Sequence, residues 1–195
     1  MVQLLEEIEE YAKVNNIPIM QKDGISFVID FIKKNNITNI LEIGSAIGYS
    51  AIKMALVDDR VKVTTIERDM DRYVVALNNI EKFNLSDRIN IILGDALEVS
   101  LSDKYDMIFI DAAKAQYIKF FERYSDNLKE GGFIISDNLS FHGLVLDETK
   151  INNRNTKQLV GKIKKYIEYL KNNDKYDTTF YTLGDGVSVS TKKVQ

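Results

Sequence analysis

Short runs of apolar residues alternate with longer amphipathic stretches along most of the chain. The short runs are 39–43 (NILEI), 62–66 (KVTTI), 89–93 (INIIL), 106–110 (DMIFI) and 132–136 (GFIIS). Such short, solidly apolar segments, rich in β-branched residues, are typical of strands in a parallel sheet that is covered on both faces. Residues 48–57, 70–83 and 115–128 lie between them and show helical spacing. The alternation predicts an α/β fold with a doubly wound, mostly parallel sheet and helices on both faces.

The two ends of the chain depart from this alternation. Apolar residues at helical spacing near the N-terminus, among them Leu4 and Ile8, predict a first helix, and a second covers 24–34 after the only proline, Pro18. Near the C-terminus a helix is predicted at 154–172. Two further apolar runs, 177–182 and 187–191, are joined by Leu-Gly-Asp-Gly, which favours a β-hairpin. We therefore expect seven strands in one domain over 1–195, with residues 1–35 forming a separate helical region at its start.

Composition limits the chemistry more than the fold. Apolar residues make up 45% and charged residues 28% of the 195 residues, an ordinary globular composition. With no cysteine and a single histidine, His142, a bound metal must be held by oxygen ligands, which favours Mg²⁺ or Ca²⁺. The N-terminus has no basic segment and no long apolar core, so neither a signal peptide nor a membrane span is expected, and the predicted location is cytoplasmic.

Polar residues that could bind a ligand follow the first three predicted strands. Gly44 and Gly48 bracket a turn after the first strand, Glu67 follows the second and Asp95 follows the third. Ligands of open α/β sheets bind beyond the carboxyl ends of strands, where a glycine turn admits the ligand and an acid about 20 residues later accepts from ribose hydroxyls. Each residue also has a simpler role: the glycines as packing positions, Glu67 as a solvated acid and Asp95 as a turn residue.

The fourth and fifth predicted strands end in a second polar group. Asp111 and Lys114 follow the fourth strand, and Asp137 and Asn138 follow the fifth. Because neighbouring strands are about 4.8 Å apart, the three oxygen-bearing side chains would meet and suit Mg²⁺. The alternative is that Asp111 caps a helix while Asp137 and Asn138 form an Asx turn.

Six blocks around these residues resemble the metal-dependent O-methyltransferase family that includes catechol and caffeoyl-CoA O-methyltransferases. The blocks are LEIGSAIGYSAIKMA, TIERD, GDALE, FIDAAKAQY, IISDNLSFHGLV and the late GDG, spread from about Ile17 to Lys192. Within the family, the segments AIGYSAI, TIERD and FIDAAK are most similar to those of the bacterial tRNA 5-hydroxyuridine methyltransferases. His142 stands where that pattern more often has a lysine.

The resemblance implies a single-domain Rossmann-like class I methyltransferase that uses S-adenosylmethionine and Mg²⁺ or Ca²⁺ and forms a homodimer. It implies that Asp111, Asp137 and Asn138 bind the metal, and that Lys114 and Asp111 act in catalysis. Residues 1–35 would form a lid over the cofactor. The implied cofactor residues are Met20, Gly44, Ser45, Gly48, Ser50, Glu67, Arg68, Asp95, Ala96 and Asp111.

The acceptor predicted from the resemblance is 5-hydroxyuridine in a tRNA anticodon loop, with a catechol-type small molecule as the alternative. Segment 150–175 adds a local excess of basic residues that fits phosphates or, equally, a solvated helix: Lys150, Arg154, Lys157, Lys162, Lys164, Lys165, Lys171 and Lys175 against Glu168 and Asp174. Tyr49, Tyr117 and Phe141 are candidates to stack on a base, or they belong to the core. A dinucleotide-dependent oxidoreductase is a remoter alternative, because it leaves Asp111, Asp137 and Asn138 without a role. A module that only binds ligands is another.

Overall fold

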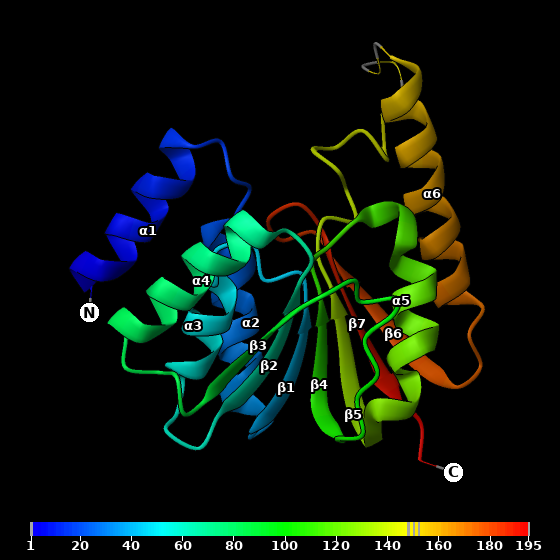
Figure 1. Cartoon of the computed structure of the whole chain (residues 1–195). Coiled ribbons are helices and arrows are strands. Elements are labelled where there is room, and N and C mark those ends of the chain that lie inside the picture. Colours follow the sequence, from blue (N-terminus) through cyan, green and yellow to red (C-terminus); the bar gives the residue numbers. More distant parts are fainter. Residues whose placement is uncertain (1, 148, 150, 152, 195) are drawn as a thin grey trace. The chain divides into compact units, whose positions relative to one another are not determined.

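The computed structural model describes residues 2–147, 149, 151 and 153–194, so Lys150 of the basic segment lies outside the described residues. The chain forms two compact units, Met1–Ser100 and Leu101–Gln195. Figure 1 labels the elements of both units.

The first unit is a three-stranded parallel layer with four helices. Its elements in chain order are α1 (Val2–Val14), α2 (Lys22–Lys34), β1 (Asn39–Ile43), α3 (Tyr49–Ala55), β2 (Lys62–Glu67), α4 (Met70–Lys82) and β3 (Ile89–Leu93). The strands lie in the order β3-β2-β1. Because Ile43 is paired with Ile66 and Glu67 with Leu93, the carboxyl ends of the three strands are level with one another.

Burial explains why the first unit adopts these elements. The central residues of β1 have no solvent exposure, as expected of a strand covered on both faces. Helix α2 buries Ile25, Val28 and Ile32 along one stripe at helical spacing, and α3 and α4 both contact β2. Helix α4 begins at an Asp69 cap, whose side chain accepts from the Arg72 backbone N–H.

The second unit combines a parallel pair of strands with an antiparallel hairpin. Its elements are β4 (Tyr105–Ile110), the 3-10 helix η1 (Lys114–Gln116), α5 (Tyr117–Tyr124), the 3-10 helix η2 (Ser125–Asn127), β5 (Leu128–Ser136), α6 (Arg154–Lys171), β6 (Tyr176–Tyr181) and β7 (Val187–Lys192). The strand order is β4-β5-β7-β6. Strand β5 is parallel to β4 and antiparallel to β7, and Ser136 at its carboxyl end lies opposite Ser188 at the start of β7.

An aromatic cluster fills the space between the helices and strands of the second unit. The Tyr166 ring of α6 meets the rings of Tyr117 and Phe121 edge to face, at 5.3 and 6.3 Å between centroids. The Tyr166 hydroxyl is 2.7 Å from the Ser136 hydroxyl, so the polar end of this buried ring is satisfied. This contact fixes α6 against the end of β5.

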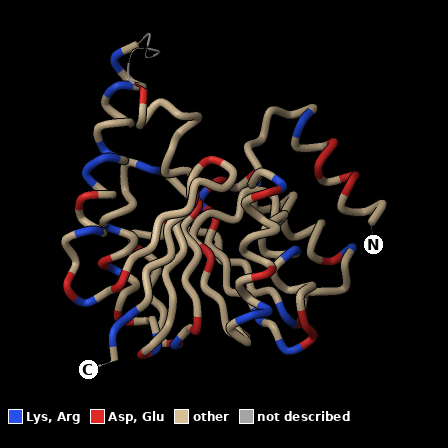
Figure 2. Tube along the Cα trace, turned by 180° about the vertical axis from the view of Figure 1, so that it is seen from behind, with Lys and Arg blue, Asp and Glu red and all other residues tan. Residues whose placement is uncertain are grey.

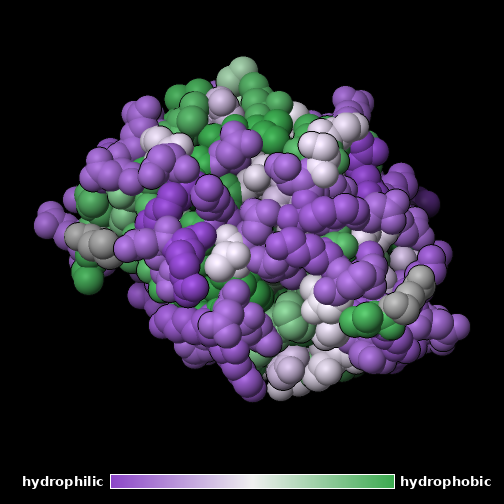
Figure 3. All heavy atoms as spheres, turned by 90° about the horizontal axis from the view of Figure 1, so that it is seen from below, coloured by the Kyte–Doolittle hydropathy of each residue, from purple (hydrophilic) through white to green (hydrophobic). Residues whose placement is uncertain are grey.

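The predicted elements are found with small shifts at their ends. The hairpin at the C-terminus is confirmed, and two elements differ from the prediction. Strand β5 begins at Leu128 rather than at 132, and the helix predicted at 115–128 is divided into η1, α5 and η2. None of the helices among the described residues combines the length and the apolar character needed to cross a bilayer. Hydrophilic side chains cover most of the face shown in Figure 3.

Candidate functional site

The turn that follows β1 has an unusual backbone. Gly44, Ala46 and Gly48 all have positive φ angles, of 97°, 45° and 82°. The Gly44 and Ser45 backbone N–H groups both donate to the Ile66 carbonyl, at 3.0 and 3.2 Å, which holds the turn against the end of β2. A side chain at Gly48 would lie 3.4 Å from the Ala76 side chain, so this glycine also allows α4 to pack closely.

Glu67 lies at the last position of β2, and both oxygens of its carboxylate accept backbone hydrogen bonds. Its Oε2 accepts from the Ala46 N–H at 2.7 Å, and its Oε1 accepts from the Asp69 N–H at 2.9 Å. Its side chain therefore joins the glycine turn to the start of α4, and it is not the solvated acid of the simpler interpretation, since only 6% of it is exposed. Each carboxylate oxygen has a second lone pair, which leaves room for ribose hydroxyl donors.

The sequence interpretation missed a buried acid in the neighbouring strand β1. Glu42, in the middle of β1, has no solvent exposure, and its carboxylate accepts from the Ser50 and Thr65 hydroxyls, each at 2.5 Å. The Ser50 hydroxyl, predicted to line the cofactor site, thus supports this internal carboxylate. The missed signal is an acid inside an otherwise apolar run, because a buried charge needs partners that local sequence does not reveal.

The other predicted cofactor residues, except Asp111, lie in the same unit. The Ser45 hydroxyl is buried and has no hydrogen-bond partner among the described residues. Asp95 accepts from the Leu97 N–H at 2.8 Å and so forms a local turn, with buried Ala96 beside it. Arg68 is exposed, and Met20 is buried against Gly24 in the segment before α2. The unpaired Ser45 hydroxyl in this turn fits a polar ligand such as the S-adenosyl group.

The second unit brings together the three side chains predicted to bind metal. Asn138 donates from Nδ2 to Asp111 Oδ1 at 3.2 Å and to Asp137 Oδ2 at 2.8 Å. The Asp137 backbone N–H also donates to the Ile110 carbonyl at 3.2 Å, which holds the end of β5 beside the end of β4. The Asn138 backbone is left-handed, with φ of 64°. The three residues therefore form one polar group at neighbouring strand ends, which we call the acidic site.

Burial raises the pKa of both carboxyl groups of the acidic site. Burial and the neighbouring charge of Asp111 raise the pKa of Asp137 to about 7. Burial also raises the pKa of Asp111, and the ammonium group of Lys114 counteracts that rise. Negative charge is therefore costly here unless a proton or a cation balances it.

The donor set of the acidic site fits a hard divalent cation. Two carboxylates and an amide provide oxygen ligands and leave further coordination positions for water or substrate. Rotation of the Asn138 amide would turn its oxygen toward the carboxylates, because the two ends of an amide are nearly isosteric. Within the described ranges, no group of three or more His, Cys, Asp or Glu side chains is arranged to hold a metal, so the amide is a necessary member of this set.

The aromatic and basic residues predicted to contact substrate have different surroundings. Lys114 is partly buried, and its Nζ lies 5.9 Å from the centre of the Phe141 ring. Tyr117 and Tyr49 are core residues, 1% and 2% exposed, so neither can stack on a base. The Tyr117 hydroxyl instead donates to the Asp137 carbonyl at 3.0 Å, a supporting role that the sequence interpretation missed. Phe141 is partly exposed and remains available for stacking.

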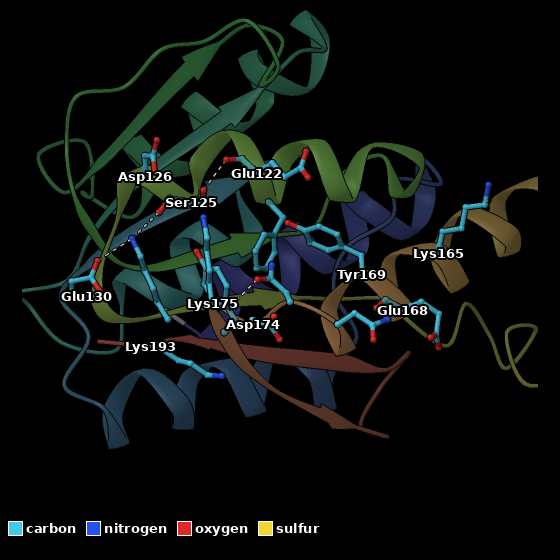
Figure 4. Close-up of a pocket in the computed structure, with 15 residues that line it drawn as sticks. Glu122, Ser125, Asp126, Glu130, Lys165, Glu168, Tyr169, Asp174, Lys175 and Lys193 are labelled. Carbon is cyan, nitrogen blue, oxygen red and sulfur yellow. Dashed lines mark hydrogen bonds and ion pairs between the residues drawn. The ribbon is translucent and has the colours of Figure 1, made fainter. Parts of the chain in front are cut away.

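A surface pocket of about 850 Å³ occurs elsewhere in the second unit (Figure 4). Its lining comes from α5, η2, β5, α6, the residues between α6 and β6, and the hairpin, and it mixes both signs of charge. Two of its lysines are engaged in ion pairs at 3.2 Å, Lys192 with Glu130 and Lys193 with Asp177. None of the residues predicted to bind cofactor or metal lines it, so it is not part of the candidate site.

Solved structures show the class of protein to which this arrangement belongs. The chain resembles a structure from Staphylococcus aureus described as a "putative caffeoyl-CoA O-methyltransferase", with a TM-score of 0.92 and 41% identity over 96% of this chain and 91% of that one. It also resembles an O-methyltransferase from Bacillus cereus in complex with SAH, with a TM-score of 0.83 and 28% identity over 98% and 91% of the two chains. The chain therefore has the α/β Rossmann-like fold of methyltransferases.

Sequence comparisons narrow the class to one family. The model of the O-methyltransferase family matches residues 1–193, and the chain belongs to that family. A caffeoyl-CoA O-methyltransferase from Stellaria longipes is 31% identical over 174 residues, which cover 84% of this chain and 70% of the relative. The protein is an S-adenosylmethionine-dependent O-methyltransferase.

Proposed function

We propose that this protein methylates a hydroxyl oxygen that has a second oxygen beside it, and that Asp111, Asp137 and Asn138 hold a divalent cation for the reaction. The observation that supports the proposal is that the Asn138 amide contacts both carboxylates at the ends of β4 and β5, Asp111 at 3.2 Å and Asp137 at 2.8 Å. A bound Mg²⁺ would orient the acceptor and lower the pKa of its hydroxyl. Two adjacent oxygens fit such a cation better than one because they can occupy two coordination positions.

Lys114 is the residue that we assign to the reacting hydroxyl. Lys114 lies three positions after Asp111, and the charge of its ammonium group counteracts the rise in the pKa of that carboxyl group, which supports this assignment. In its neutral form Nζ can take the hydroxyl proton, and in its charged form it can stabilise the oxyanion. Methyl transfer from a sulfonium is an in-line displacement, so the remaining task of the protein is to hold donor and acceptor in line. The turn after β1 and Glu67 serve the donor in this proposal.

The acceptor that we propose is 5-hydroxyuridine at the wobble position of tRNA, whose O5 hydroxyl lies beside the O4 carbonyl. Helix α6 supports it: its buried stripe includes Val160 and Ile163, whereas Arg154, Lys157, Lys162, Lys165 and Lys171 are exposed. Figure 2 shows the basic residues along this helix. Such a row suits phosphates, and a base in an anticodon loop can leave its stack at small cost.

A catechol-type small molecule is the second candidate acceptor. The names of similar proteins favour it, since several are caffeoyl-CoA O-methyltransferases and one from Niastella koreensis is a catechol O-methyltransferase. Catechols also present two adjacent oxygens, in their case two hydroxyls instead of a hydroxyl and a carbonyl. The acidic site therefore fits both, and only the surface around it distinguishes them. The homodimer remains a prediction.

One labelling experiment separates the two acceptors. The protein is incubated with methyl-labelled S-adenosylmethionine and Mg²⁺, together with tRNA that carries 5-hydroxyuridine or with a panel of catechols. We expect label in the tRNA, lost when EDTA is added. The double variant Lys162→Glu/Lys165→Glu should raise the KM for tRNA, because it reverses two charges on α6. The matched control Lys33→Glu/Lys34→Glu alters two exposed lysines at the end of α2 and should not. Label found only in catechols would reject the tRNA acceptor.

The role of Lys114 is tested by turnover at saturating substrate. Lys114→Ala should reduce kcat about 100-fold or more, the usual contribution of a positioned proton acceptor. Lys114→Arg retains the charge but cannot accept a proton, so it separates the base from the oxyanion stabiliser. Lys119→Ala, an exposed lysine on the neighbouring α5, is the control. An unchanged kcat in Lys114→Ala would remove Lys114 from the mechanism.

A further inference from the structure

The turn between β6 and β7 lies directly against the loop that follows β5. The Leu139 N–H donates to the Gly186 carbonyl at 2.9 Å, and the Ser140 N–H donates to the Asp185 carbonyl at 2.7 Å. Gly186 has a φ of 85°, and a Cβ there would lie only 2.7 Å from the Ser140 backbone nitrogen. This glycine therefore permits a contact between two main chains that any other residue would prevent.

The side chain of Asp185 makes a second set of bonds to the same loop. Its Oδ1 accepts from the Ser140 hydroxyl at 2.7 Å and from the His142 backbone N–H. Only 5% of Asp185 is exposed, and its Oδ2 is buried with no hydrogen-bond partner among the described residues. The imidazole Nδ1 of His142 is 3.7 Å from this oxygen. A carboxylate buried at this depth is costly, so its bonds to the loop must offset desolvation.

The loop held by Asp185 has a backbone that would not keep its shape by itself. Asn138, Phe141 and His142 have φ angles of 64°, 47° and 56°, in the left-handed region that residues other than glycine rarely adopt. Such residues persist where surrounding contacts determine their conformation. One of the three, Asn138, belongs to the acidic site, and Asp137 immediately precedes it. The bonds from Asp185 are therefore placed to fix the direction of both side chains.

We propose that Asp185 is a positioning residue that orients Asp137 and Asn138 for cation binding through its bonds to Ser140 and His142. The proposal rests on the proposed function, in which these two residues and Asp111 hold the cation. Asp185 itself touches neither substrate nor cation in this proposal. It fixes the loop that carries Asp137 and Asn138. Residues that orient metal ligands in this way commonly affect metal affinity.

The test measures cation binding apart from catalysis. Mn²⁺ is titrated into the full chain without S-adenosylmethionine or acceptor, and free Mn²⁺ is followed by electron paramagnetic resonance. Asp185→Ala should raise the Kd for Mn²⁺ by about 10- to 100-fold, the range typical of outer-partner mutations. Asp185→Asn keeps the Oδ1 acceptor and should restore most of the affinity. The Kd for S-adenosylmethionine, whose predicted ligands lie almost entirely in the first unit, should stay within about twofold for each variant, which a general loss of structure would not allow.

Two further variants complete the design. Ser140→Ala removes one of the two donors to Asp185 Oδ1 without adding bulk, so it should weaken Mn²⁺ binding less than Asp185→Ala and in the same direction. If Asp185→Ala does not fold, the Mn²⁺ affinity of Ser140→Ala tests the proposal in its place. Asp177→Ala, an exposed aspartate of β6 in the same hairpin, is the control and should bind Mn²⁺ as the unmodified protein does.

The outcomes separate the two proposals. Absence of Mn²⁺ binding by the unmodified protein would reject the proposed cation site. Normal binding by the unmodified protein together with unchanged affinity in Asp185→Ala, or in Ser140→Ala where the first variant does not fold, would reject only the positioning role of Asp185.

Discussion

The change Glu67→Gln tests the donor site most directly, because each oxygen of the carboxylate has its own backbone donor. Oε2 accepts from Ala46 N–H at 2.7 Å and Oε1 from Asp69 N–H at 2.9 Å. In glutamine one oxygen becomes an NH₂ group, which would face a backbone N–H. One of the two donors then has no acceptor, and the remaining bond is no longer to a charged group.

The size of the effect follows from these bonds. Loss of a hydrogen bond to a charged group costs about 1.5–3 kcal/mol, so the free energy of unfolding of the ligand-free protein should fall by about that amount. If Glu67 also accepts from the ribose of S-adenosylmethionine, a similar loss applies to binding. That loss corresponds to a rise in Kd of roughly 10- to 150-fold.

Two measurements on the same variant distinguish the two roles of Glu67. Urea unfolding gives the stability, and isothermal titration calorimetry gives the Kd for S-adenosylmethionine. Asp71→Asn, which makes the same charge change at an exposed position in the first turn of α4, should alter neither quantity by much. A variant that loses stability yet binds S-adenosylmethionine normally would refute the ribose contact and leave Glu67 as an anchor of the turn.

Two further predictions concern the acidic site. Burial and the charge of Asp111 raise the pKa of Asp137 to about 7. In the metal-free protein, the contribution of this group to the free energy of unfolding is therefore fully present below its ordinary pKa of 3.8. It is lost as the pH rises through 7. Mg²⁺ must displace that proton, so its affinity should increase between about pH 6 and pH 8, measured by calorimetry; a flat profile would contradict the assignment. In Tyr117→Phe the ring still packs on Tyr166, but the buried Asp137 carbonyl loses its hydrogen-bond donor. This loss should lower the free energy of unfolding by about 1–3 kcal/mol and weaken Mg²⁺ binding. Urea unfolding and the same titration check it, and a variant equal to the unmodified protein in both would show that the hydroxyl supports neither.

The fold was predictable where burial on both faces leaves a simple pattern. β1 and β3 occupy the predicted residues, because each is a short run of apolar residues. The start of β5 was missed because the exposed residues Lys129 and Glu130 are followed by Gly131 and Gly132, so this segment lacks an apolar run. Those residues resemble a turn, and only the pairing of Leu128 with Tyr105 makes the segment a strand.

The candidate site was predictable where residues follow strand ends and not where they depend on distant partners. Asp111, Asp137 and Asn138 were expected to meet, since the carboxyl ends of parallel neighbours lie at one edge. Asp185 reaches Ser140 across 45 positions in the chain, and no local pattern signals such a contact. Glu42 was likewise missed because its partners, Ser50 and Thr65, come from two other elements.

The direction of β7 explains how the C-terminal hairpin comes to support the acidic site. β7 is antiparallel to β5, so its first residues lie beside the last residues of β5, with Ser188 opposite Ser136. The short turn before β7 is thereby placed at the end of β5, directly beside the loop that begins with Asp137 and Asn138. A parallel strand in that place would instead bring its own carboxyl end there, followed by a connection to a helix. The reversed strand supplies a tight turn whose glycine and aspartate can hold a strained loop, so we infer that the departure from the parallel pattern serves the chemistry of the site.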